Sequence, residues 1–99
     1  MKDLMNKEID TAEMNKLVGL LCLAEIPHEI TECWGTPQIW YPSAEEPVCD
    51  VICHSGSYGH EEGLLEIMGL VDEDHGDSVE GYLTAREVFR RILNHYLSE

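Results

Sequence analysis

The apolar residues of this 99-residue chain follow two different periods, and this change of period limits what the chain can fold into. Near each end they recur every three to four residues, as on one face of a helix. In the middle, short runs rich in β-branched and aromatic residues alternate with glycine, proline and acidic residues. Such runs are typical of strands joined by turns. The sequence therefore predicts a helix at each end and a sheet between them.

The first helix is expected to begin at a capping box. Asp10 and Glu13 have the spacing at which each side chain can bind a free amide at the start of a helix. Apolar residues continue at helical spacing to about Ala24, and Pro27 ends the pattern. The residues on this apolar face are Ile9, Met14, Leu17, Val18 and Leu21.

The second helix has the stronger pattern. Thr84 and Glu87 form another capping box, and one apolar stripe follows them. Arg90 and Arg91 are expected on the exposed side of this helix. The stripe consists of Val88, Phe89, Ile92, Leu93, Tyr96 and Leu97.

Four strands are expected between the helices, at residues 28–34, 38–41, 48–54 and 64–71. Gly35, Thr36 and Pro37 suit a hairpin connection between the first two strands. The glycine-rich residues 55–63 are expected to form turns, and residues 72–81 an acidic loop.

These elements predict one α+β domain that spans residues 1–99. Its sheet is expected to be small and mostly antiparallel, with about four strands, and to be flanked by an N-terminal and a C-terminal helix. The apolar share of 43% is enough to build one core. No apolar run approaches the length of a membrane-spanning helix.

The charge of the chain limits its partners. Twenty acidic residues stand against six basic ones, which gives a formal net charge of −14. No Lys or Arg occurs between Leu17 and Ala85. Such a surface repels phosphate, so direct binding of DNA or RNA is disfavoured. With four cysteines and no signal-peptide pattern, the chain is expected in the cytoplasm with reduced thiols.

Three stretches carry a resemblance to a known group of proteins. VCDVICHSGSYG with LLEIMGL lies within residues 48–70, DSVEGYLTAREVFRRI covers residues 77–92, and QIWYP covers residues 38–42. The chain resembles a family of small uncharacterised proteins carried by phages and prophages of gut Firmicutes. The resemblance implies a mobile-element origin, a location in the cytoplasm of a bacterial host cell and a role against a host defence system, including CRISPR enzymes. It implies no activity and no catalytic residue.

The acidic surface is the leading candidate site. Carboxylates spaced roughly like phosphates can occupy a groove lined with Lys and Arg and exclude nucleic acid from it. The partner would be a basic surface of a host or phage protein. The alternative is that acidic charge only keeps a small domain soluble. The candidate partner-binding residues lie in or beside loops: Glu45, Glu46, Glu61, Glu62, Asp72, Glu73, Asp74, Asp77 and Glu80.

A metal-binding or degenerate nuclease-like domain is the main alternative. Asp50 and Glu66 in neighbouring strands are similar to the carboxylates of an Asp…Glu-x-Lys nuclease site, which hold magnesium. Met68 stands where that arrangement has lysine, and no lysine follows Lys16. An active nuclease is therefore disfavoured. The chain is expected to be no enzyme and to need no cofactor.

The cysteines suggest two further readings. Cys49 and Cys53 would share one strand face and could direct two sulfurs at one ion, but a single Cys-x3-Cys pair is weak evidence for zinc. Packing in the core is the better reading for both, and for Cys22 in the first helix. The sequence does not determine whether Cys33, Cys49 or Cys53 is exposed or binds a metal. Cysteine–histidine catalysis by Cys53 would need a partner such as His28 or His60.

The last alternative is a self-assembling accessory protein, in which apolar strands and aromatic residues form a homodimer interface. Trp34, Trp40, Tyr41 and Tyr58 are expected mostly in the core or in cross-strand pairs.

Overall fold

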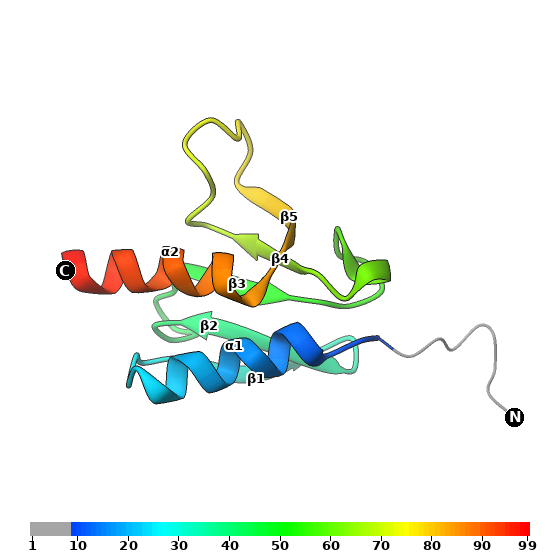
Figure 1. Cartoon of the computed structure of the whole chain (residues 1–99), viewed down its shortest axis with the longest axis horizontal. Helices are drawn as coiled ribbons and strands as arrows, with labels where there is room; N and C mark the ends of the chain where they lie inside the picture. The colour runs from blue at the N-terminus through cyan, green and yellow to red at the C-terminus, as the bar shows by residue number, and fades with distance from the viewer. Residues whose placement is uncertain (1–8) are drawn as a thin grey trace, which may run out of the picture.

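A computed structural model describes residues 9–99 of the protein. An antiparallel sheet of five strands forms its centre (Figure 1). Two helices bracket the sheet in sequence, which confirms the predicted α+β class. The elements in chain order are α1 (Ala12–Leu23), β1 (Glu29–Cys33), β2 (Thr36–Tyr41), β3 (Cys49–Ile52), the short 3-10 helix η2 (His60–Glu62), β4 (Leu65–Met68), β5 (Val79–Leu83) and α2 (Ala85–Ser98).

The strands follow one another in the sheet in their sequence order, and each neighbouring pair is antiparallel. β3 lies at the centre, as its β-branched sequence predicts. The β1–β2 connection is shorter than expected. It consists of Trp34 and Gly35, both at positive φ (54° and 80°), which is the backbone of a two-residue hairpin turn. Thr36 and Pro37 already belong to β2.

β5 is a fifth strand that was not predicted, and its first three residues, 79–81, were expected to belong to an acidic loop at residues 72–81. Its residues pair with β4, but the register is interrupted: Ile67 faces Glu80, whereas Leu65 faces Leu83. β5 therefore contains one more residue than β4 over this interval, which is a β-bulge. The bulge and the sequence Glu80-Gly81 break the alternation by which a strand is recognised.

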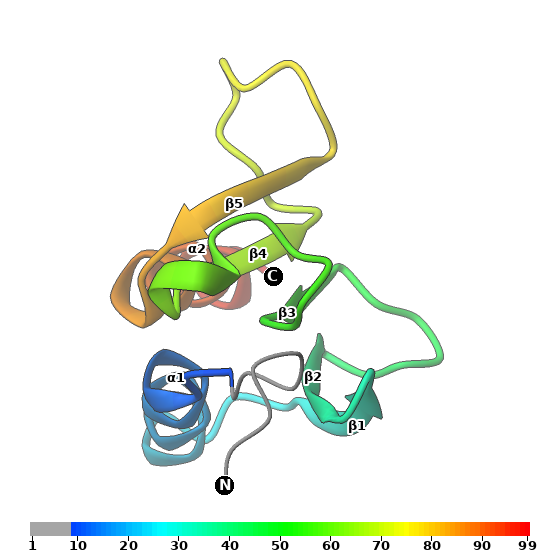
Figure 2. The ribbon, with the colours of Figure 1, turned by 90° about the vertical axis from the view of Figure 1, so that its right-hand side faces the viewer.

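Both helices cover the same face of the sheet (Figure 2), so only alternate strand residues reach the core. Cys49 and Val51 of β3 are buried on this face, and Leu65 and Ile67 of β4 lie beside them. The helices contribute residues that are at most 1% exposed: Met14, Leu17 and Leu21 from α1, and Ala85, Val88 and Ile92 from α2.

The capping box at Thr84 is confirmed. The Glu87 amide donates to Thr84 Oγ1 at 3.2 Å, and the Thr84 amide donates to Glu87 Oε1 at 2.8 Å. The box expected at Asp10 and Glu13 is wrong. Asp10 Oδ1 accepts from the Ala12 amide at 2.9 Å. Glu13 Oε1, however, accepts from the Ala85 amide of α2 at 2.7 Å. Glu13 thus joins the starts of the two helices, and this hydrogen bond lowers the pKa of its carboxyl.

The apolar stripe of α2 is buried only in part. Val88 and Ile92 are fully buried, whereas Tyr96 is 39% and Leu97 is 71% exposed. Arg91 was expected in solvent, but its guanidinium turns back to Glu80 of β5. The side of α2 that faces the core therefore differs from the side that the full apolar stripe predicts.

This rotation predicts unequal effects of two truncations in one helix. Ile92→Ala removes a fully buried side chain and should lower the free energy of unfolding by about 2–5 kcal/mol. Leu97→Ala, at 71% exposure, should change it by less than about 0.5 kcal/mol. Urea unfolding monitored by circular dichroism measures both, and equal losses would show that the buried face is assigned wrongly.

Candidate functional site

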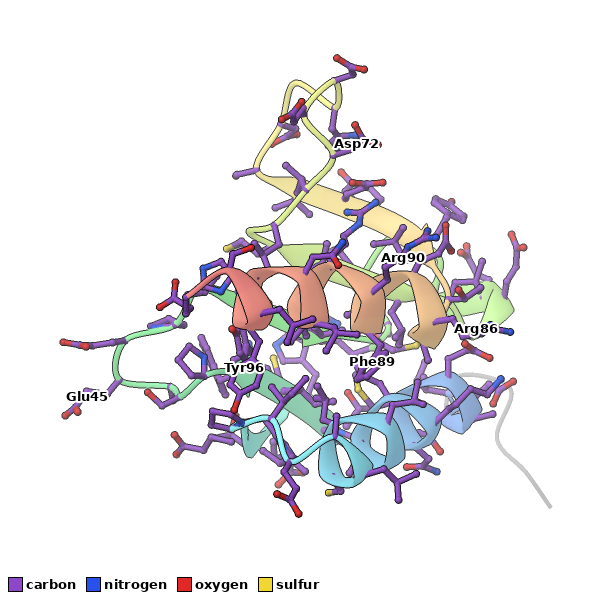
Figure 3. The ribbon with its side chains drawn as sticks, turned by 60° about the vertical axis from the view of Figure 1, so that its left-hand side comes forward. Glu45, Asp72, Arg86, Phe89, Arg90 and Tyr96 are labelled. Carbon is purple, nitrogen blue, oxygen red and sulfur yellow. The ribbon has the colours of Figure 1, made fainter. Side chains whose placement is uncertain are left out.

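The nine predicted acidic residues lie in separate parts of the molecule. Glu45 and Glu46 belong to the β2–β3 connection, and Glu61 and Glu62 to η2. Asp72, Glu73, Asp74 and Asp77 lie in the connection from β4 to β5, residues 69–78, called here the acidic loop. These eight residues are all exposed. Glu45 and Asp72 point away from different sides of the domain (Figure 3), so the acids do not form one stripe.

The acidic loop carries the largest group and projects from the sheet (Figure 1). Its own polar groups shape it. Asp72 Oδ1 accepts from the Asp74 amide at 3.1 Å, and the Asp72 carbonyl accepts from the His75 amide at 2.9 Å. His75 Nε2 lies 2.7 Å from the Val79 carbonyl, to which it donates. The loop therefore has a defined turn structure that holds its carboxylates outward.

Glu80 differs from the other eight, and the expectation that it is an exposed site residue is wrong. Its oxygens accept from Arg91 Nη1 at 2.8 Å and Nη2 at 3.1 Å, and its side chain is only 17% exposed. The bulge explains this, because it places Glu80 opposite Ile67 on the face that α2 covers. The bond with Arg91 lowers the pKa of Glu80 to about 2.

The Glu80–Arg91 pair also fixes the first part of the acidic loop. Glu80 Oε1 accepts from the Asp72 amide at 3.0 Å, and Arg91 Nη1 donates to the Leu70 carbonyl at 3.2 Å. The loop is therefore attached to α2 through one guanidinium, and the pair supports the candidate site without being part of its exposed surface.

Two exposed tyrosines lie beside the acidic loop. Tyr58 is 63% and Tyr82 is 56% exposed. An open groove of about 420 Å³ runs between them and the loop. We call it the acidic-aromatic groove. It is lined by Tyr58, His75, Asp77, Val79, Glu80, Gly81 and Tyr82.

Two glycines let the loop that carries Tyr58 approach β5. A Cβ atom at Gly81 would collide with Tyr58 Cβ, and one at Gly59 would lie 2.9 Å from the Tyr82 amide nitrogen. Tyr82 itself has φ of 61°, a conformation that bulky residues adopt rarely. The backbone of the bulge thus directs this ring into solvent. The sequence analysis missed Tyr82, and a Gly-Tyr pair in a strand was the available signal for a bulge.

Asp50 and Glu66, the carboxylates of the nuclease-like alternative, each accept a hydrogen bond from another residue. Asp50 faces Met68 across the sheet and accepts from Gln38 Nε2 at 2.9 Å, and Glu66 accepts from the Tyr58 amide at 2.7 Å. Within residues 9–99 no group of three or more His, Cys, Asp or Glu side chains is placed to hold a metal ion. These carboxylates instead hold β2 against β3 and the Tyr58 loop against β4.

The expected core packing of Cys49 and Cys53 is confirmed, since they are 2% and 1% exposed. Burial raises the pKa of the Cys49 thiol to about 12 and also raises that of Cys53. Cys33 is half-buried. The expectation for Cys22 is wrong: it is exposed, and its sulfur lies 3.9 Å from His28 Nε2.

The histidines named as partners of Cys53 contact other groups. The polar neighbour of Cys53 is the Asp10 carbonyl at 3.8 Å, and His60 Nδ1 lies 2.7 Å from the Ser57 carbonyl.

Among the helices of residues 9–99, none has the length and apolar character to cross a membrane. Comparison with known proteins found no matching family model, curated protein or solved structure.

The Glu80–Arg91 pair predicts a pH dependence of stability. A carboxyl whose pKa is lowered on folding contributes stability above its unfolded value of 4.5 and loses it as the pH falls toward 2. Glu80→Gln should therefore be less stable than wild type near neutral pH, and the difference should shrink below about pH 4.5. Denaturant unfolding across this range measures it. The exposed Glu32→Gln is the matched control, and a constant Glu80→Gln deficit at all pH values would contradict the assignment.

The thiols should separate into two classes in the native protein. Cys22 is exposed and should react first with an aromatic disulfide reagent, whereas Cys49 and Cys53 should react only on unfolding because they are buried and their pKa values are raised. Mass spectrometry of the labelled peptides identifies each site. Early labelling of Cys49 at the rate of Cys22 would show that β3 opens in the native state.

Proposed function

We propose that this protein binds a basic surface of a protein partner through the acidic loop and the acidic-aromatic groove. The observation that carries the proposal is the presence of four exposed carboxylates, Asp72, Glu73, Asp74 and Asp77, on one projecting loop beside two exposed tyrosines. Carboxylates attract Lys and Arg at long range, and aromatic rings supply the contact area that anchors an interface.

Electrostatic attraction would guide the approach of the partner. The chain carries −14 overall, and no Lys or Arg lies anywhere between Leu17 and Ala85 to offset the acidic loop. Within the screening length of about 8–10 Å at physiological salt, a basic groove is attracted and nucleic acid is repelled. The association should therefore be fast and should weaken as salt is added.

The tyrosines would give the contact its specificity. A Lys or Arg side chain of the partner can lie over the ring of Tyr58 or Tyr82 while its charge meets the Asp77 carboxylate, since all three residues line the groove. Cation–π contact is worth about 0.5–1 kcal/mol at exposed sites. A bulky cation with hydrogen-bond donors fits this combination better than a small metal ion does.

In its most concrete form, the proposal is a DNA-mimic inhibitor that occupies the nucleic-acid channel of a host defence protein. The phage and prophage resemblance favours this form, because it implies a role against a host defence system. Nucleic acid should then displace this protein from its partner, since the two compete for the same Lys and Arg side chains.

The test compares two variants that each lose four carboxylates. Asp72, Glu73, Asp74 and Asp77 changed together to their amides should leave the fold intact and weaken partner binding by more than about tenfold. The same change at Glu45, Glu46, Glu61 and Glu62 together should have a smaller effect, because none of these four residues lines the acidic-aromatic groove. Glu25 and Glu32, both exposed and outside the set, provide the control.

Binding is measured in two steps. Affinity capture from host lysate, at low and high salt, identifies the protein retained by wild type and lost with the acidic-loop variant. That protein is then purified, and double-stranded DNA is titrated into the complex. Displacement by DNA supports mimicry. Retention that is unchanged by the loop variant, by salt and by DNA would refute the proposal.

A further inference from the structure

The protein also has a cationic surface that its proposed function does not use. Lys16 pairs with Glu13 at 3.2 Å, and Arg91 pairs with Glu80. Across residues 9–99, no carboxylate lies within ion-pair distance of Arg86 or Arg90, and both are exposed. They are four residues apart on α2 and therefore lie on one side of the helix. Among the described residues, Arg86 and Arg90 are thus two exposed cations without an ion-pair partner.

These arginines border a groove of about 450 Å³ on the outer side of the helices, called here the helix groove. Its lining consists of Leu20 from α1 and Arg86, Glu87, Phe89, Arg90 and Leu93 from α2. Phe89 lies between the two helices, and Arg86 and Arg90 lie along α2 (Figure 3). Glu87 forms no ion pair with either arginine, and its carboxylate instead accepts from the Thr84 amide and hydroxyl at 2.8 and 3.0 Å.

Charge and apolar surface are separated along the helix groove. The two guanidinium groups belong to the first half of α2, whereas Leu93 and the 71% exposed Leu97 belong to its second half. On α1, Leu20 is followed at helical spacing by Leu23, which is 86% exposed. The surface thus has a cationic end and an apolar end, which is the order of groups in an anionic molecule with a hydrocarbon tail.

We propose that the helix groove binds a monomeric straight-chain carboxylate, with its head group at Arg86 and Arg90 and its tail over Phe89, Leu93 and Leu20. The volume is within the range of about 300–1,000 Å³ for small-molecule sites. Guanidinium groups bind carboxylates through paired, charge-assisted hydrogen bonds. The apolar residues bury the tail and give the free energy that a lone surface ion pair lacks.

The net charge of the protein favours this small anionic ligand over larger anionic ones. An anionic membrane or an acidic polypeptide brings many negative charges close to a chain of −14, so repulsion opposes it. A single carboxylate brings one charge, directly to two arginines. The helix groove therefore fits a free, singly charged amphiphile rather than a membrane surface.

The experiment uses decanoate below its micelle concentration, with isothermal titration calorimetry for affinity and NMR shifts of backbone amides for location. Wild type should bind one molecule, with shifts confined to α1 and α2. Arg86→Gln and Arg90→Gln should each weaken binding by at least about fivefold, because each removes a charged hydrogen-bond donor. Lys16→Gln removes the same charge outside the helix groove and should bind as wild type does.

Two matched ligands define the chemistry. Butanoate, which has the head group without the tail, and decyltrimethylammonium, which has the tail with a cation, should both fail to bind in the helix groove. Absence of decanoate binding, equal affinity of the arginine variants, or equal binding of the cationic amphiphile would overturn the proposal. So would preferential binding of an acidic helical peptide, or a dimer in sedimentation that Arg90→Gln dissociates, because either would assign the surface to another occupant.

The acidic-loop variant separates this site from the proposed function. Its four changes lie outside the helix groove, so its affinity for decanoate should stay within about twofold of wild type. Loss of partner binding with retained decanoate binding is the result expected if the two sites are independent.

Discussion

The burial of one sheet face beneath two helices is the constraint on which the rest of this structure depends. It takes alternate residues from the inner strands, such as Val51 and Ile67, and packs them in one core with Leu17 and Ile92. A chain with 20 acidic residues can place almost none of them in that layer, because an unpaired buried charge is costly. The acids are therefore confined to loops, helix surfaces and the open sheet face. Packing thus determines where the negative charge is available for a partner.

The carboxylates that do approach the packed layer each have a specific partner. Glu13 reaches the first amide of α2, and Glu80 reaches the guanidinium of Arg91. Both contacts join segments that the sheet and helices bring together: one ties α1 to α2, and the other ties the acidic loop to α2. The exposed acids of the loop can repel one another without unfolding it, because its first part is held by Glu80 and Arg91 and the Gly69 amide donates to the Ser78 carbonyl across its base.

The sequence predicts those features that depend on neighbouring residues and fails at those that depend on distant ones. The Thr84–Glu87 capping box needs four consecutive residues, and its prediction is confirmed. β3 is recognised because β-branched residues report local strand preference. Glu13 has the same local pattern as Glu87, but its partner is 72 residues away, so no local rule finds it. The exposure of Cys22 was missed similarly, because it depends on how α1 is rotated against the sheet. Eight of the nine candidate acids are exposed as predicted, while Glu80 is not, because a bulge turned it inward.

The three arginines of α2 show how one helix can separate structure from binding. Arg91 lies on the side that faces β5 and neutralises Glu80, so its charge serves the fold. Arg86 and Arg90 line the helix groove together with the apolar residues Leu20, Phe89 and Leu93. Neither of these guanidinium groups has an ion-pair partner within residues 9–99, so their charges do not serve the fold as that of Arg91 does. Their position is instead what an anionic ligand with a tail requires. The acidic loop and the helix groove would then take ligands of opposite charge on different elements, and salt should weaken the first contact far more than the second, since apolar burial persists when charges are screened.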